Sequence, residues 1–151
     1  MTEACAAARD YTTISVSQLD DQVATFALSE PAVHNLLLRN METARANLAI
    51  LEAFVKQFDW ACTWVRPVAG TTAFIKFVDR NGRTVDDVQF CQRLQARTGV
   101  LLAPGSQCFG GGVDFKGFVR FGYVPEPQVL IEGLQALGQF MDGEYGDLPV
   151  V

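Results

Sequence analysis

The sequence predicts an α+β fold: a small, mainly antiparallel sheet of three or four strands with helices on one face, preceded by one long helix. Two observations support this prediction. Apolar residues recur at spacings of three and four in several segments, and they alternate at every second position in others. Because 151 residues is close to the usual size of one domain, we expect residues 1–151 to form a single domain.

The first half of the chain predicts two helices. Ser17, followed three residues later by Asp20, has the pattern of a capping box and predicts a helix over about 18–29. Pro31 suits the opening of a second helix over about 32–58. At 1.5 Å per residue, a helix of about 27 residues extends about 40 Å, which exceeds the diameter of a domain of this size, so we expect part of it to overhang.

The second half alternates strands and helices. Residues 62–65 and 72–78 show the period of two that is typical of strands. Thr84 with Asp87 then predicts the capped start of a helix that ends at Gly99.

The remaining elements follow this third helix. Residues 100–103 read as a short buried strand, and a glycine-containing loop leads to a strand over 118–123. Pro125 and Glu126 predict the opening of a final helix, and residues 143–151 are expected to be loosely ordered.

The composition argues against several classes of protein. A net charge of −5 without any basic cluster argues against nucleic-acid binding. Four cysteines far apart in sequence and a single histidine indicate neither a zinc site nor a disulfide framework. The first residues lack a basic signal-peptide region, and no apolar stretch approaches the ~18 residues of a membrane span, so we expect a cytoplasmic protein without membrane contact.

Arg120 is the candidate binding residue. In the predicted strand, Phe118 and Arg120 share one face, whereas Val119, Phe121 and Tyr123 share the other. A guanidinium among aromatic rings suits a bidentate grip on a carboxylate. The alternative is an ordinary arginine on a solvated strand face, or one paired with a nearby aspartate.

The motifs around Arg120 extend along most of the chain. A Pro104-Gly105 turn and a loop precede the strand, and Gly122 follows the arginine by two positions. Upstream are segments 9–15, 39–40 and 44–48, and the strand entry with Pro67, Ala69, Gly70, Ala73 and Phe74. Together, residues 9–142 resemble the C-terminal small domain of a fold-type I (class I/II) pyridoxal-phosphate-dependent aminotransferase without its large cofactor domain. The resemblance implies that the long helix is of the interdomain type and that Arg120 binds the substrate carboxylate.

The resemblance also bears on the cofactor. In that family the large domain supplies a Ser-x-x-Lys segment, an aspartate for the pyridine nitrogen and the phosphate cup. The lysines of this chain are Lys56, Lys76 and Lys116, and none is in a Ser-x-x-Lys setting. We therefore expect no cofactor to be bound by the chain alone, with pyridoxal phosphate bound only in the full-length family, and no catalytic residue is assigned.

Other residues have less specific interpretations. Gly110, Gly111 and Gly112 could offer N–H groups to an anion, but loop flexibility is the simpler reading. The Asp20-Asp21 and Asp86-Asp87 pairs suit helix capping, and His34 suits a partly exposed helix. Trp60 and Tyr11 are candidates for a binding surface, and Trp64 for the core.

Three functions remain open. The first is an aminotransferase-like domain that binds a carboxylate-bearing small molecule but does not transaminate alone. The second is a stand-alone, cofactor-independent biosynthetic cyclase or isomerase, in which Tyr11, Tyr123 or an aspartate near the loop carries protons. The third is a regulatory or dimerisation subunit of a full-length aminotransferase. The 49% hydrophobic content predicts a homo-oligomer, or a partner chain that covers the apolar faces of the first two helices.

Overall fold

The structure of the chain is a computed structural model that describes residues 3–5, 7–8 and 17–151. Its internal contacts divide the chain into two compact units, Met1–Arg39 and Asn40–Val151. Tyr11 and the 9–15 motif lie outside the described residues. Within the described ranges, no helix combines the length and the apolar character needed to cross a bilayer.

Helices α2 and α3 follow the sequence pattern closely. Helix α2 spans Gln18–Ser29, and the Ser17 hydroxyl accepts a hydrogen bond of 3.4 Å from the Asp20 N–H, which confirms the predicted cap. Helix α3 spans Pro31–Gln57. Only its C-terminal half is buried along one stripe, through Leu48, Leu51, Phe54 and Val55. The apolar side chains of its N-terminal half are exposed: Leu36, Leu37, Leu38 and Met41.

The sheet confirms the predicted fold class. Strands β1 (Cys62–Trp64), β2 (Thr72–Phe77), β3 (Ala103–Pro104) and β4 (Phe118–Gly122) form one sheet in the order β1-β2-β4-β3. Every neighbouring pair is antiparallel. In the central pair, Phe74 lies opposite Arg120 and Ile75 lies opposite Val119.

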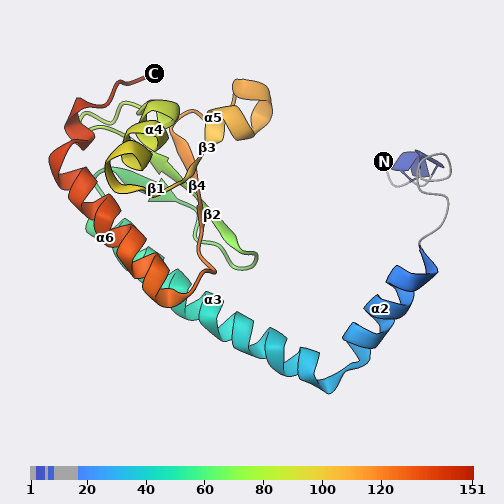
Figure 1. Cartoon of the computed structure of the whole chain (residues 1–151). Helices are drawn as coiled ribbons and strands as arrows, with labels where there is room; N and C mark the ends of the chain where they lie inside the picture. Colours follow the sequence, from blue (N-terminus) through green and yellow to red (C-terminus); the bar gives the residue numbers. More distant parts are fainter. Residues whose placement is uncertain (1–2, 6, 9–16) are drawn as a thin grey trace. The chain divides into compact units, whose positions relative to one another are not determined.

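Helices cover one face of this sheet and form the core with it. Helices α4 (Asp87–Thr98) and α6 (Pro127–Gly143) pack there together with the C-terminal half of α3, and α3 and α6 run side by side (Figure 1). The most deeply buried side chains come from all these elements: Leu51, Ile75, Phe77, Phe90, Leu94, Val119 and Leu137. The other sheet face carries aromatic residues of the loop that contains α5 (Gly105–Cys108) and the 3-10 turn η1 (Gly110–Gly112).

Two of the predicted helix starts are wrong in detail. Asp86, and not Thr84, caps α4: its Oδ1 accepts hydrogen bonds of 3.0 Å from the N–H groups of Val88 and Gln89. Thr84 instead forms an isolated β-bridge with Val78. The final helix begins with Pro127 and not at residue 125, because Pro127 occupies the first turn, where its missing N–H costs nothing.

The segment after α4 is not a buried strand. Leu101 is 73% exposed, and only Ala103 and Pro104 pair with β4. Gly99 ends α4 in a left-handed conformation with φ of 76°. The apolar run after Gly99 therefore joins the sheet only at Ala103 and Pro104.

The C-terminal tail is packed, whereas we expected residues 143–151 to be loosely ordered. Residues Tyr145–Asp147 form the turn η2, and the Tyr145 side chain is 2% exposed. Its hydroxyl donates a hydrogen bond of 2.7 Å to the Val78 carbonyl, and Val150 forms a β-bridge with Val85. Contacts with residues far away in sequence thus hold the tail.

Candidate functional site

Arg120 lies on the sheet face opposite the helices. Along β4, Val119 and Phe121 are buried against the helices, while Arg120 and Gly122 are exposed and Phe118 is half-buried. Tyr123 continues the buried face. The predicted division of this strand into two faces is therefore confirmed.

The guanidinium of Arg120 has an aromatic neighbour and no acidic partner among the described residues. Its Cζ lies 5.8 Å from the centre of the Phe109 ring, a distance compatible with a cation–π interaction. The ion pairs in the described part of the chain use Arg66, Arg83 and Arg97. Within the described residues, the donors of Arg120 are thus not committed to a carboxylate, and no local aspartate pair is seen there.

A cluster of phenylalanine rings lies beside Arg120 on this sheet face. Phe74, the residue opposite Arg120 on β2, is its centre, with ring centroids 5.3 Å from Phe109, 5.2 Å from Phe115 and 5.0 Å from Phe118. Rings at these distances pack favourably in tilted or offset arrangements. The cluster gives the exposed Arg120 an apolar surrounding on one side.

The loop between β3 and β4 (residues 105–117) supplies two of these rings, and glycine is required at both of its ends. A Cβ at Gly105 would lie 2.7 Å from the Phe118 carbonyl oxygen. Gly117 has φ of 76°, and a Cβ there would lie 2.4 Å from Thr84 Cγ2. Near the second end, Phe115 has φ of 61°, an unfavourable backbone conformation for a bulky residue. Close contacts therefore restrict the two ends of the loop to glycine.

Asp87 has a role that sequence reasoning missed. Its side chain is in the first turn of α4 and is 2% exposed. Oδ2 accepts hydrogen bonds from the Ser106 N–H at 2.9 Å and the Ser106 hydroxyl at 2.8 Å, and Oδ1 accepts one from the Gly117 N–H at 3.0 Å. Because Asp86 already caps the helix, the second aspartate of the pair was free for another partner. The presence of two adjacent aspartates at the start of a helix, where one is enough for the cap, was the sequence pattern that could have indicated this role.

The other candidates do not join the Arg120 site. The Tyr123 hydroxyl donates to the Gly70 carbonyl at 2.6 Å from the buried side of the strand. Trp60 packs against Tyr145 and Arg80, and Trp64 packs against the core as expected. His34 is exposed on α3, as predicted. Within the described residues, no group of three His, Cys, Asp or Glu side chains could hold a metal ion.

The described residues do not by themselves fit pyridoxal phosphate. A lysine that forms a Schiff base needs a pocket that lowers its pKa. Lys56 and Lys116 are exposed, and half-buried Lys76 lies over the Phe118 ring at 5.8 Å from its centre. No lysine lines the cavity between α6 and residues 98–102, the cavity between α3 and α6, or the cavity beside Tyr123.

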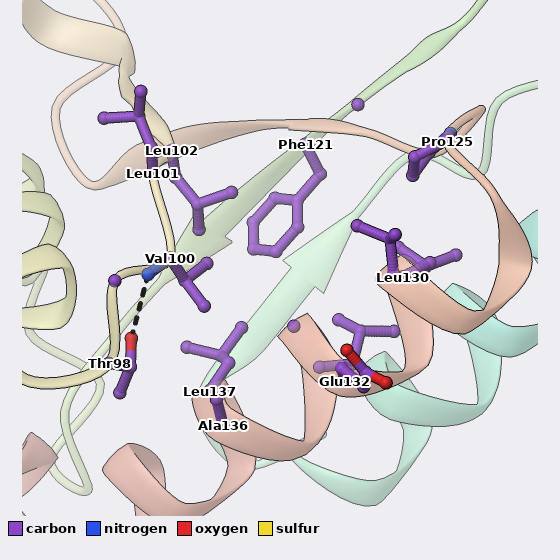
Figure 2. A pocket seen from close by; sticks show the side chains of 15 residues that line it. Thr98, Val100, Leu101, Leu102, Phe121, Pro125, Leu130, Glu132, Ala136 and Leu137 are labelled. Atoms are coloured by element: carbon purple, nitrogen blue, oxygen red, sulfur yellow. Dashed lines mark hydrogen bonds between the residues drawn. The ribbon is translucent and has the colours of Figure 1, made fainter.

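The cavities lie away from Arg120. One of about 440 Å³ lies between α6 and residues 98–102, on the helix-covered side of the sheet, and its wall is mostly apolar (Figure 2). Its labelled residues include Leu101, Phe121 and Leu137, with Glu132 as a charged residue at one side. A second cavity of about 450 Å³ lies between α3 and α6, and a third of about 270 Å³ is lined by Arg45, Gly70 and Tyr123.

Comparison with known proteins shows that the chain is similar to parts of pyridoxal-phosphate-dependent enzymes. It is 32% identical over 132 residues to capreomycidine synthase from Streptomyces vinaceus, a match that covers 87% of this chain and 31% of that protein. A pyridoxal-phosphate-dependent aminotransferase from Streptococcus suis 89-1591 has a TM-score of 0.68 and 34% identity, covering 89% of this chain and 33% of that one. The pyridoxal-phosphate-dependent cyclase OrfR has a TM-score of 0.69 and 26% identity, and the match covers 90% of this chain and 35% of that one.

No family model matches the chain. The chain spans about a third of the length of these three relatives. The expected resemblance to part of an aminotransferase is confirmed at the level of the fold.

Proposed function

We propose that this chain, which has the fold of about one third of a pyridoxal-phosphate-dependent aminotransferase, binds the carboxylate of a small-molecule substrate through Arg120. The observation that carries the proposal is the position of the guanidinium. It is exposed, has no acidic partner among the described residues, and lies beside the phenylalanine cluster around Phe74.

The chemistry of the site suits a carboxylate with an apolar substituent. The planar guanidinium offers N–H donors in a fork that matches the two oxygens of a carboxylate. The rings of Phe74 and Phe109 offer an apolar surface next to it. In this arrangement Arg120 holds and orients the substrate, and a pyridoxal phosphate group on the remainder of an aminotransferase-like protein would supply the chemistry.

A binding titration tests the proposal. The probe is 3-phenylpropionate, and its primary amide, which has the same shape without the charge, is the matched control ligand. Amide shifts in ¹H–¹⁵N spectra of the chain should report binding of the acid at β4 and at the loop of residues 105–117. Arg120→Gln should weaken this binding about fivefold, because exposed ion pairs contribute up to about 1 kcal/mol.

Two variants make the titration specific. Arg80→Gln removes another arginine that lies over an aromatic ring, at 4.3 Å from the Trp60 ring centre, and should leave probe binding unchanged. Arg120→Lys keeps the charge but loses the planar fork, so its affinity should fall between those of the wild type and Arg120→Gln. Equal binding of acid and amide, or equal binding by wild type and Arg120→Gln, contradicts the proposal.

A ring-forming reaction is the second candidate for the whole protein. Its support is the likeness to a protein named capreomycidine synthase and to a pyridoxal-phosphate-dependent cyclase. The same carboxylate-binding role of Arg120 serves a cyclase and an aminotransferase. Incubating a protein that contains both this chain and a cofactor domain with an amino acid distinguishes them: a transaminase produces a keto acid, and a cyclase produces a ring without net loss of the amino group.

We also propose that a partner covers the apolar side chains of α2. Leu19, Val23, Phe26 and Leu28 are 58 to 79% exposed on this helix. The proposed partner is a chain segment that supplies the remainder of the aminotransferase-like fold. Replacing Val23 and Phe26 with Ser should reduce binding of a hydrophobic dye and any self-association seen by size-exclusion chromatography. A monomer that binds no dye would contradict this proposal.

A further inference from the structure

The loop of residues 105–117 is fixed at both ends by one buried carboxylate. Asp87 accepts two hydrogen bonds from Ser106, near the start of the loop, and one from Gly117, its last residue. A loop whose ends are joined in this way has the form of a compact Ω-loop. The carboxylate is in the first turn of α4, where the helix dipole favours a negative charge.

The two anchored ends have different consequences. Gly117 directly precedes β4, and its carbonyl also accepts a hydrogen bond of 2.8 Å from the Phe77 N–H. Asp87 therefore fixes the point at which the strand carrying Arg120 begins. At the other end, Ser106 lies in the short helix α5, which Phe109 follows directly. The position of Phe109 under the guanidinium thus depends on the anchor at Ser106.

We infer that Asp87 is a positioning residue for Arg120: by fixing Ser106 and Gly117 it keeps Phe109 and Phe115 packed on Phe74 beside the guanidinium. Both of its carboxylate oxygens accept hydrogen bonds from the loop. Only the expected effect of Asp87 on ligand binding rests on the proposed function. The expected effects of Asp87 on the loop and on the surroundings of Arg120 do not depend on any ligand.

The test compares two neighbouring aspartates. Asp87→Asn keeps the size of the side chain but leaves one acceptor oxygen where the carboxylate had two, so Ser106 and Gly117 cannot both keep their bonds. Asp86→Ala is the control, because Asp86 caps the same helix through Val88 and Gln89 and does not contact the loop. Both variants should lower thermal stability, but only Asp87→Asn should disturb the loop.

Two measurements without ligand show whether the loop is disturbed in Asp87→Asn but not in Asp86→Ala. Hydrogen exchange of the Ser106 and Gly117 amides should lose protection in Asp87→Asn and retain it in Asp86→Ala. The Arg120 Nε–H resonance should shift in Asp87→Asn, because the ring current of Phe109 at its side changes, and stay in place in Asp86→Ala. If Asp87→Asn does not fold, Ser106→Ala removes one of the three hydrogen bonds and should produce the same changes in weaker form.

The outcomes separate the inference from the proposed function. An unchanged Arg120 resonance in Asp87→Asn, or in Ser106→Ala if only that variant folds, overturns the inference whether or not the loop loosens. If the resonance moves and wild type binds 3-phenylpropionate more tightly than Arg120→Gln, Asp87→Asn should bind the probe more weakly than Asp86→Ala, and equal affinities of these two variants then overturn the inference as well. If wild type and Arg120→Gln bind the probe equally, the proposed function fails, while the resonance shift still supports the positioning role.

Discussion

The buried hydroxyl of Tyr145 provides a quantitative test of the packed C-terminal tail. Tyr145→Phe removes the hydroxyl that donates to the Val78 carbonyl at 2.7 Å, but keeps the ring contacts with Trp60, Phe77 and Phe90. The carbonyl then loses this partner, at a site where the tyrosine side chain is 2% exposed. An unsatisfied buried acceptor costs about 1–3 kcal/mol, and the half-buried position of Val78 places the expected loss at about 1–2 kcal/mol.

Urea unfolding followed by tryptophan fluorescence measures this loss. The slope of the free energy against urea should stay unchanged, because the variant exposes the same surface on unfolding. Tyr123→Phe is the matched comparison, since the Tyr123 hydroxyl is also buried and donates to one carbonyl, that of Gly70, at 2.6 Å. A measurable loss for Tyr123→Phe together with no loss for Tyr145→Phe would refute the packed tail.

Three further predictions concern the loop, a buried thiol and the cofactor. Gly117→Ala should destabilise the chain more than Gly82→Ala in urea unfolding. Both glycines have positive φ, which costs an alanine about 1–2 kcal/mol, but only a Cβ at Gly117 would meet a neighbour. Equal losses of stability in the two variants would contradict the structure. Burial raises the pKa of Cys62 from 9.0 to about 12, so the neutral thiol stabilises the fold below pH 9 and this stability is lost as the pH rises through 12. Wild type should therefore lose roughly 1 kcal/mol relative to Cys62→Val between pH 8 and 10, and parallel pH curves would count against burial of the thiol. Incubation with pyridoxal phosphate and borohydride should label none of the three lysines stoichiometrically in mass spectra, whereas one fully labelled lysine would reveal cofactor chemistry in this chain.

The regular elements could be predicted because their signals are local. The pattern from Ser17 onward predicted a helix over 18–29, and α2 spans Gln18–Ser29. The alternation along residues 118–123 predicted that Arg120 shares a face with Phe118 and not with Val119, Phe121 and Tyr123, and β4 has this division. Both inferences depend only on residues within a few positions of each other, where periodicity is informative.

The errors arose where partners are distant in sequence. The run 100–103 is apolar, but a short apolar run does not reveal whether a strand is buried or crosses an edge. Chain ends are often loosely ordered, which led to the expectation for residues 143–151, yet Tyr145 finds its acceptor 67 positions earlier, at Val78. The role of Asp87 needs residues 106 and 117, and no local pattern connects these three positions.

The central claim is that the Arg120 guanidinium binds a carboxylate, and its own N–H resonances test this most directly. In a titration of the wild-type chain with 3-phenylpropionate, the Arg120 Nε–H signal should move to lower field with the same saturation curve as the loop amides, since a charge-assisted hydrogen bond deshields the proton. The primary amide should leave the signal nearly in place. A signal that does not respond to the acid, while other parts of the chain do, would contradict the assignment of Arg120 as the carboxylate-binding residue.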